Sequence, residues 1–161
     1  MNKTATFKPT SSRHSGFGLL EVVISIAVLS IGLLGVAHMQ AVGAVSIEHS
    51  YQRSQATVLA YDIADRIRAN PGSANNYLTA TMNASQANLQ SGCRSTSGCT
   101  AAQMAENDLY EWDTAMRAAL PAPTGVITLS GETYAVSIRW DDNGDGVVNE
   151  GDPSFLMRFE L

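Results

Sequence analysis

An uninterrupted run without a charged side chain, from Val22 to Ile47, constrains this chain more than any other feature. It continues an apolar stretch that begins at Phe17, and about 20 apolar residues suffice for a helix to cross a hydrocarbon core of about 30 Å. The residues before it are basic and polar, which predicts a cytoplasmic N-terminus. The pattern divides the chain into a basic leader (1–16), an apolar helical segment (17–45) and a globular head (46–161).

The charges of the chain are unevenly placed. The leader contains Lys3, Lys8 and Arg13 and no acid, whereas all 15 acidic residues lie in the remainder, which has no lysine. The formal net charge of −5 therefore combines +3 in the leader with −8 in the rest. An acidic body argues against nucleic-acid binding, which needs clustered Lys and Arg.

Glu21 is a carboxylate near the start of the apolar segment. The segment by itself is compatible with a cleaved secretory signal or an uncut membrane anchor. The apolar region of a signal peptide usually has only about 7–15 residues, however. An ionised acid near the bilayer interior is costly and is rarely kept without a partner. These two observations weigh against both interpretations.

The sequence from Gly16 through Phe17 and Leu19-Leu20-Glu21 into the apolar run resembles the class III signal of type IV pilins and pseudopilins. The resemblance implies that a prepilin peptidase cuts between Gly16 and Phe17 and methylates the new Phe17 amine. It also implies that Glu21 pairs with the Phe17 amine of an adjacent subunit during filament assembly, although pairing within one chain at i, i+4 spacing is equally allowed.

The helix is predicted to continue far beyond the membrane segment. No proline occurs between Pro9 and Pro71, and the residue before a proline disfavours the α conformation, so the helix should end near Ala69. Such a helix would be about 80 Å long at about 1.5 Å per residue. Its second half is amphipathic and its predicted buried face consists of Ala56, Leu59, Ala60, Ile63, Ala64 and Ile67. Asp62 and Arg66 form an i, i+4 pair on a more polar face, which contributes only tenths of a kcal/mol.

The sequence of the rest of the head predicts a second helix and a small sheet. Residues 100–120 have helical periodicity, and the acidic residues among them (Glu106, Asp108, Glu111 and Asp113) are expected on a solvated face. Residues 126–129, 134–140 and 154–161 are predicted as three antiparallel strands, with the long helix covering one face of the sheet. The fold class is thus α+β, and the resemblance implies the type IV pilin arrangement.

A second, shorter stretch is similar to PilV-type minor pilins. It runs from Asp108-Leu109-Tyr110-Glu111-Trp112 to Ala119-Leu120-Pro121. The position of the two cysteines just before it fits the same subgroup.

Cys93 and Cys99 are the two cysteines of the chain, separated by a short turn-forming segment. This spacing is unusual for a zinc or redox site. In an oxidising compartment a disulfide closing a small loop is expected. Two free buried thiols are the alternative.

The acidic turn 141–152 is a candidate calcium site. Its pattern resembles an EF-hand loop ending in Asp, because oxygen ligands recur at the expected positions and Gly146 allows a sharp turn. The proposed ligands are Asp141, Asn143, Asp145, the Val147 carbonyl, Asn149 and Asp152. The flanks are predicted as strands rather than helices, and a metal-free polar hairpin loop is the alternative. Calcium would have a structural role here.

No motif for a nucleophile, a phosphate loop or a metal hydrolase is recognisable, so we expect no enzymatic activity. The resemblance implies a minor pilin that helps to prime or assemble a type IV pilus. Its partners would be the major pilin, other minor pilins, the prepilin peptidase and the inner-membrane assembly platform. It would first reside in the inner membrane with a periplasmic head and then in the fibre. The alternatives are a type II secretion pseudopilin and a single-pass envelope protein with a calcium-binding recognition head.

Overall fold

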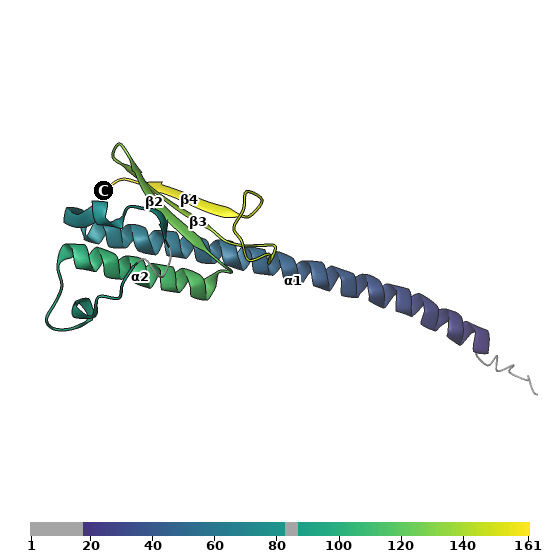
Figure 1. The fold of residues 1–161 in the computed structure, drawn as a ribbon. Coiled ribbons are helices and arrows are strands. Elements are labelled where there is room, and N and C mark those ends of the chain that lie inside the picture. Colours follow the sequence, from purple (N-terminus) through teal and green to yellow (C-terminus); the bar gives the residue numbers. More distant parts are fainter. Residues whose placement is uncertain (1–17, 83–86) are drawn as a thin grey trace, which may run out of the picture. The chain divides into compact units, whose positions relative to one another are not determined.

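The longest element is the helix α1, Leu19–Ala69. The structure, a computed structural model, describes residues 18–82 and 87–161 (Figure 1). Contacts within the chain define two compact units that divide after Ala44. In the first unit the described residues are Gly18 and the beginning of α1, and all of them are exposed. Among the described residues, α1 is the one helix long and apolar enough to cross a membrane.

The second unit, Val45–Leu161, contains the rest of α1 and all other elements. The predicted end of α1 at Ala69 is confirmed, since Asn70 leaves the helical conformation before Pro71. The further elements are η1 (Pro71–Tyr77), β1 (Thr79–Met82), η2 (Ser91–Arg94), α2 (Ala101–Ala119), β2 (Thr124–Ser130), β3 (Thr133–Arg139) and β4 (Ser154–Phe159). The second predicted helix is therefore confirmed as α2.

In the part of the chain that the structure describes, the sheet has four antiparallel strands in the order β1-β2-β3-β4. The three predicted strands are confirmed as β2, β3 and β4, and β1 was not predicted. Strands β2 and β3 are joined by a tight turn between Ser130 and Thr133, in which Gly131 has a φ of +62°. Within the second unit the sheet and α2 both lie along α1 (Figure 1). The predicted α+β fold, a long helix on a small antiparallel sheet, is confirmed.

The core forms where α1, α2 and the sheet meet. All six residues of the predicted apolar face of α1 are buried, together with Gln52. The indole nitrogen of Trp112, on α2, donates to the backbone oxygen of Leu59 at 2.8 Å, and that of Trp140 donates to the Gln52 amide oxygen at 3.0 Å. Both tryptophans are fully buried, so each satisfies its polar atom on α1.

Gly125, on β2, allows α2 to approach the sheet closely. A Cβ atom at this position would lie 2.6 Å from the Trp112 ring and 2.7 Å from the methyl carbon of Met116. Side chains cannot approach so closely without moving. The absence of a side chain at Gly125 therefore sets the separation between α2 and β2.

The prediction that the acidic residues of α2 form a solvated face is wrong for two of them. Asp108 is 7% exposed and Asp113 is not exposed at all. Each has a cationic partner, Arg66 for Asp108 and Arg117 for Asp113. The buried face of α2 is thus wider than its apolar residues indicate, because Asp108 and Asp113 are buried on either side of them, each in an ion pair.

Candidate functional site

The start of α1 carries the carboxylate that the sequence singled out. Glu21 lies in the first turn of α1, where the helix dipole favours a negative charge. Its backbone N–H donates to the Gly18 oxygen at 2.9 Å. The predicted cleavage site between Gly16 and Phe17 lies outside the described residues. The pairing of Glu21 with the Phe17 amine therefore stays a prediction.

Two serines in the apolar part of α1 satisfy their hydroxyl groups within the helix. Ser25 donates to the backbone oxygen of Glu21 and Ser30 to that of Ile26, both at 2.7 Å. Such i−4 bonds leave no hydroxyl proton facing hydrocarbon. The apolar segment is therefore compatible with lipid despite its polar residues.

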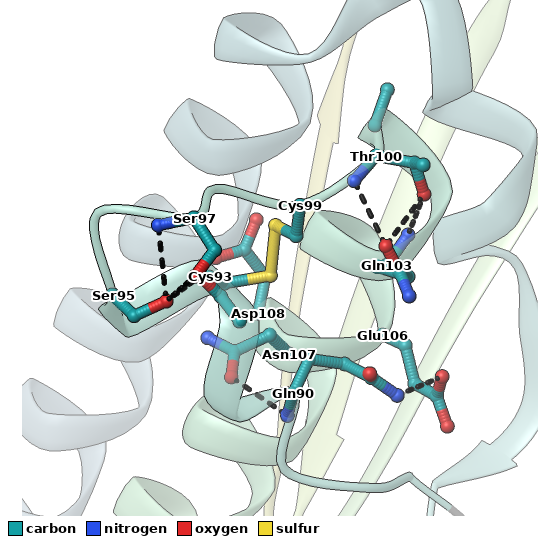
Figure 2. Close-up of a disulfide and its surroundings, with 12 residues drawn as sticks. Gln90, Cys93, Ser95, Ser97, Cys99, Thr100, Gln103, Glu106, Asn107 and Asp108 are labelled. Atoms are coloured by element: carbon teal, nitrogen blue, oxygen red, sulfur yellow. Dashed lines mark hydrogen bonds between the residues drawn. A yellow bond between two sulfur atoms is a disulfide. The ribbon is translucent and has the colours of Figure 1, made fainter.

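The predicted disulfide between Cys93 and Cys99 is confirmed, with a Cα–Cα distance of 4.8 Å (Figure 2). Residues 90–100 form a compact loop that includes η2. Within it Gly98, at a φ of +71°, turns the chain back towards α2. The loop ends at Thr100, which forms a reciprocal capping box with Gln103 at the start of α2.

Side chains of α2 also hold the segment before the disulfide (Figure 2). The Gln90 side-chain amide donates to Glu106 at 2.7 Å, and the Gln90 backbone N–H donates to the Asn107 amide oxygen at 3.2 Å. Asn88 also donates to Glu106, and its side-chain hydrogen bond lowers the pKa of the Glu106 carboxyl. The disulfide and these bonds together fix the loop on the first turns of α2.

Arg66 is the centre of a charge cluster between α1 and α2. Its guanidinium donates to Asp62 at 3.0 Å, as predicted, but also to Asp108 at 2.9 Å and Glu111 at 3.0 Å. The Tyr77 hydroxyl donates to the other oxygen of Asp108 at 2.6 Å. The Arg66 hydrogen bond lowers the pKa of the Glu111 carboxyl, and burial together with the bond to Asp108 raises the pKa of the Tyr77 hydroxyl. The sequence identified one of these three ion pairs.

The acidic loop 141–152 folds back on its own backbone N–H groups. Both oxygens of the Asp141 carboxylate accept, from the N–H of Gly144 at 2.7 Å and of Gly146 at 2.8 Å. These hydrogen bonds lower the pKa of the Asp141 carboxyl, and the bond from Gly146 contributes most. Gly144 and Gly146 have φ values of +77° and +83°, so the sharp turn expected at Gly146 is confirmed.

The other predicted ligands take part in the same network. Asn143 accepts from the N–H of Asp145, Asp145 from that of Val147, and Asn149 from that of Gly151. Asp152 closes the loop by accepting from the N–H of Asn149 at 2.6 Å and of Asp142 at 3.3 Å. The predicted ligands therefore lie in one loop, which is held together by hydrogen bonds from its own backbone N–H groups to these side chains.

The oxygens in this loop are of the kind that calcium prefers, and each bonded carboxylate oxygen keeps a second lone pair. However, no three His, Cys, Asp or Glu side chains within residues 18–82 and 87–161 lie close enough together to hold a metal ion. A cation would therefore have to draw Asp141, Asp145 and Asp152 closer together. The residue types fit calcium, and the site stays a prediction.

The acidic loop is attached to α1 near the start of the head. The His49 Nδ1 lies 2.6 Å from an Asp142 oxygen, and the neighbouring Trp140 is bonded to Gln52. The backbone N–H of Asp141 donates to the Pro121 oxygen, and Arg139 donates to the Asn149 oxygen. The contacts with His49 and Gln52 hold the loop beside the first turns of α1 that belong to the head, and the other two join it to the end of α2 and to β3.

Two family models match this chain in adjoining regions. The prokaryotic N-terminal methylation motif matches residues 11–37, and the model described as type IV pilin Tt1218 matches residues 38–110. Together they extend over residues 11–110 of the 161. The chain belongs to the type IV pilins.

No curated protein and no solved structure matches this pilin significantly. The methylation-motif match covers the predicted cleavage site and Glu21. The other match covers the head half of α1, the disulfide and the first part of α2. Strands β2, β3 and β4 and the acidic loop lie beyond the matched residues.

Proposed function

We propose that the pilin is a minor pilin, processed by a prepilin peptidase and incorporated into a type IV pilus with the major pilin and other minor pilins. The observation that carries the proposal is the methylation motif, matched over residues 11–37, with Glu21 in the first turn of α1. The stretch from Asp108 to Pro121, similar to PilV-type proteins, supports the minor role. It supplies Trp112 to the core and Asp108 to the Arg66 cluster.

In this proposal the chain first spans the inner membrane once, with its head in the periplasm, and the assembly platform then moves it into the fibre. The disulfide supports a periplasmic head, because disulfides persist in oxidising compartments. The proposed role is structural rather than enzymatic, as in the family to which the chain belongs. Mass spectrometry of the N-terminus tests the processing step. A chain beginning at methylated Phe17 supports it, and an intact Met1 would leave a single-pass envelope protein as the better description.

Glu21→Ala is expected to leave cleavage intact and to impair incorporation into the fibre. In the fibre the carboxylate would neutralise the Phe17 amine of a neighbour in a poorly solvated environment, where an unpaired charge costs several kcal/mol. A loss of about 1.4 kcal/mol already corresponds to a tenfold change in an equilibrium. We therefore expect at least about a tenfold drop in the variant recovered from sheared pili.

The matched control for this experiment is Glu48→Ala, since Glu48 is an exposed carboxylate on the same helix beyond the apolar run. Immunoblots of sheared pili and of whole cells separate incorporation from expression. Normal incorporation of the Glu21 variant would reject the pairing. Recovery of the unmodified chain in secretion pseudopili rather than pili would favour the type II secretion alternative.

We propose calcium as a structural ligand of the acidic loop. The presence of the proposed oxygen ligands in one loop that turns sharply at Gly146 supports it, as does the contact of the loop with α1. Millimolar calcium is expected to release or absorb heat on binding to the head, residues 45–161. It should also raise the melting temperature by several degrees, since a ligand at about 100 times its dissociation constant stabilises by about 2.7 kcal/mol.

Calorimetry and thermal melts with Asp145→Ala and Glu150→Gln complete this test. Asp145 is a proposed ligand, and Glu150 is an exposed acid of the same loop that is not. Binding should be lost in the first variant and kept in the second. No heat and no shift in the unmodified head would reject the site and favour the metal-free hairpin.

A further inference from the structure

Strand β4 forms one edge of the sheet, and its outer side is open. Among the described elements it is hydrogen-bonded to β3 alone, in a regular register from Ser154 to Phe159. It contains no proline, no bulge and no charge that points towards the core, which are devices that proteins use to block an exposed edge. The opposite edge, β1, is shorter and pairs irregularly with β2. An added strand would therefore find a regular ladder at β4.

The register determines which backbone groups of β4 point to the open side. Residues that flank a two-residue turn exchange both hydrogen bonds, as Ser130 and Thr133 do, and the bonding then alternates along each strand. Every second residue of β3, beginning at Tyr134, therefore bonds to β4. The partners of these residues on β4 are Phe159, Met157 and Phe155. The remaining residues of β4 point their N–H and C=O groups away from the sheet, and they are Ser154, Leu156 and Arg158.

The side chains of β4 give this edge an apolar side and a basic side. Phe155 and Met157 pack against the core but are only partly buried. Leu156 and Arg158 lie on the solvent side of the sheet and are exposed. Within residues 18–82 and 87–161 no carboxylate is paired with Arg158, whereas four other arginines of the head each have an acidic partner. The edge thus offers open backbone groups, incompletely covered apolar side chains and one arginine without an acid.

We propose that the open edge of β4 binds an extended segment of a different protein chain, which adds a strand to the sheet. Backbone hydrogen bonds to Leu156 and Arg158 supply the affinity, and alternate side chains of the segment supply the specificity. On the core side the segment carries apolar residues that complete the burial of Phe155 and Met157. On the solvent side it carries an aspartate or glutamate beside Arg158.

This charge requirement favours a different chain over a second copy. Strand β4 contains no acidic residue, so the β4 edge of a second copy would bring no carboxylate to Arg158. The proposal concerns the head alone and does not depend on the proposed function. A negative result in the test below would therefore leave the assignment of a minor pilin untouched.

The test uses the full chain in detergent micelles and an eight-residue peptide of alternating valine and threonine, with glutamate in place of one central threonine. A second peptide has lysine at that position. Fluorescence anisotropy of the labelled peptides, with empty micelles as the blank, is expected to show at least about fivefold tighter binding of the glutamate peptide. The head is acidic overall, so non-specific attraction would favour the lysine peptide instead. Arg158→Glu should reverse the preference.

Amide hydrogen exchange, followed by nuclear magnetic resonance on the same samples, locates the peptide. The glutamate peptide in excess should slow exchange at Leu156 and Arg158 by at least about tenfold. Exchange at Phe155 and Met157 should change little, because these N–H groups already bond to β3. Leu156→Pro removes an N–H that faces the open side, which an edge strand tolerates, and should abolish binding. Leu156→Thr keeps this N–H and should bind normally.

Three results would overturn the proposal. The first is equal affinity for the two peptides, or no binding of either at millimolar concentration. The second is binding that survives Leu156→Pro, or equal protection of all four amides, since the peptide would then lie elsewhere. The third is slow exchange at Leu156 and Arg158 without peptide that increases with protein concentration, which would make a second copy the occupant of the edge.

Discussion

Trp112→Ala is expected to lower the free energy of unfolding of the head by about 3–5 kcal/mol. Trp112 is fully buried, and its ring fills the space that Gly125 leaves open on β2. The substitution also removes the hydrogen bond to the Leu59 oxygen. The loss therefore combines a large cavity with a missing contact between α1 and α2.

Urea denaturation of residues 45–161, followed by far-ultraviolet circular dichroism, measures this change. Trp112→Phe keeps most of the ring and removes the indole hydrogen bond, so it should cost only about 1–2 kcal/mol. Met104→Ala, at a partly exposed position of the same helix, is the control and should stay within about 0.5 kcal/mol. A loss below about 1 kcal/mol for Trp112→Ala would contradict the packing described here.

Arg66→Met is expected to destabilise the head by about 2–3 kcal/mol at pH 7. Breaking a fully buried ion pair costs about 3–5 kcal/mol. We expect a smaller loss of stability for this variant because the Arg66 side chain is 30% exposed, so that solvent screens its charge. The substitution leaves Asp108 and Glu111 close together with no shared cation. Arg53→Met, which removes an exposed arginine from the same helix, should have little effect.

The effect of Arg66→Met should depend on pH. Arg66 lowers the pKa of the Glu111 carboxyl in the folded head, so this stabilisation is fully present above the unfolded pKa of about 4.3. It is lost as the pH falls through the lower pKa of the folded state. The difference in unfolding free energy between the unmodified head and the variant should therefore shrink from pH 7 to pH 3. An unchanged difference across this range would show that the ion pair to Glu111 contributes nothing.

The sequence predicts those parts of this pilin that depend on local rules. Pro71 ends α1, the alternation of residues 134–140 produces β3, and Gly146 turns the acidic loop. Strand β1 was missed because it is short and its pairing with β2 is irregular. Its position depends on a partner strand from which η2 and α2 separate it in the sequence.

The charge cluster shows why the rest could not be predicted. Asp62 and Arg66 are close in sequence, and their pairing follows from helix geometry. Asp108 lies on α2 and Tyr77 in η1, and nothing local indicates that both join the cluster around Arg66. The contact between His49 and Asp142 joins two other distant segments and is equally invisible in the sequence. Long-range polar pairs depend on the packed fold.

The contacts between α1 and the rest of the head have a mechanical consequence. Gln52 is bonded to Trp140, Leu59 to Trp112, and Arg66 to Asp108 and Glu111. Arg68 lies 4.7 Å from the centre of the Phe159 ring. These attachments are spread over about 24 Å of helix at about 1.5 Å per residue.

A pilin in a fibre under tension is pulled along α1. Attachments that are spread along the pulling direction are loaded in shear, so they must break at the same time. Contacts that are loaded one after another would break in sequence, at a lower force. The head should therefore resist axial force far better than its few polar contacts suggest, and peeling it sideways from α1 is the weaker direction.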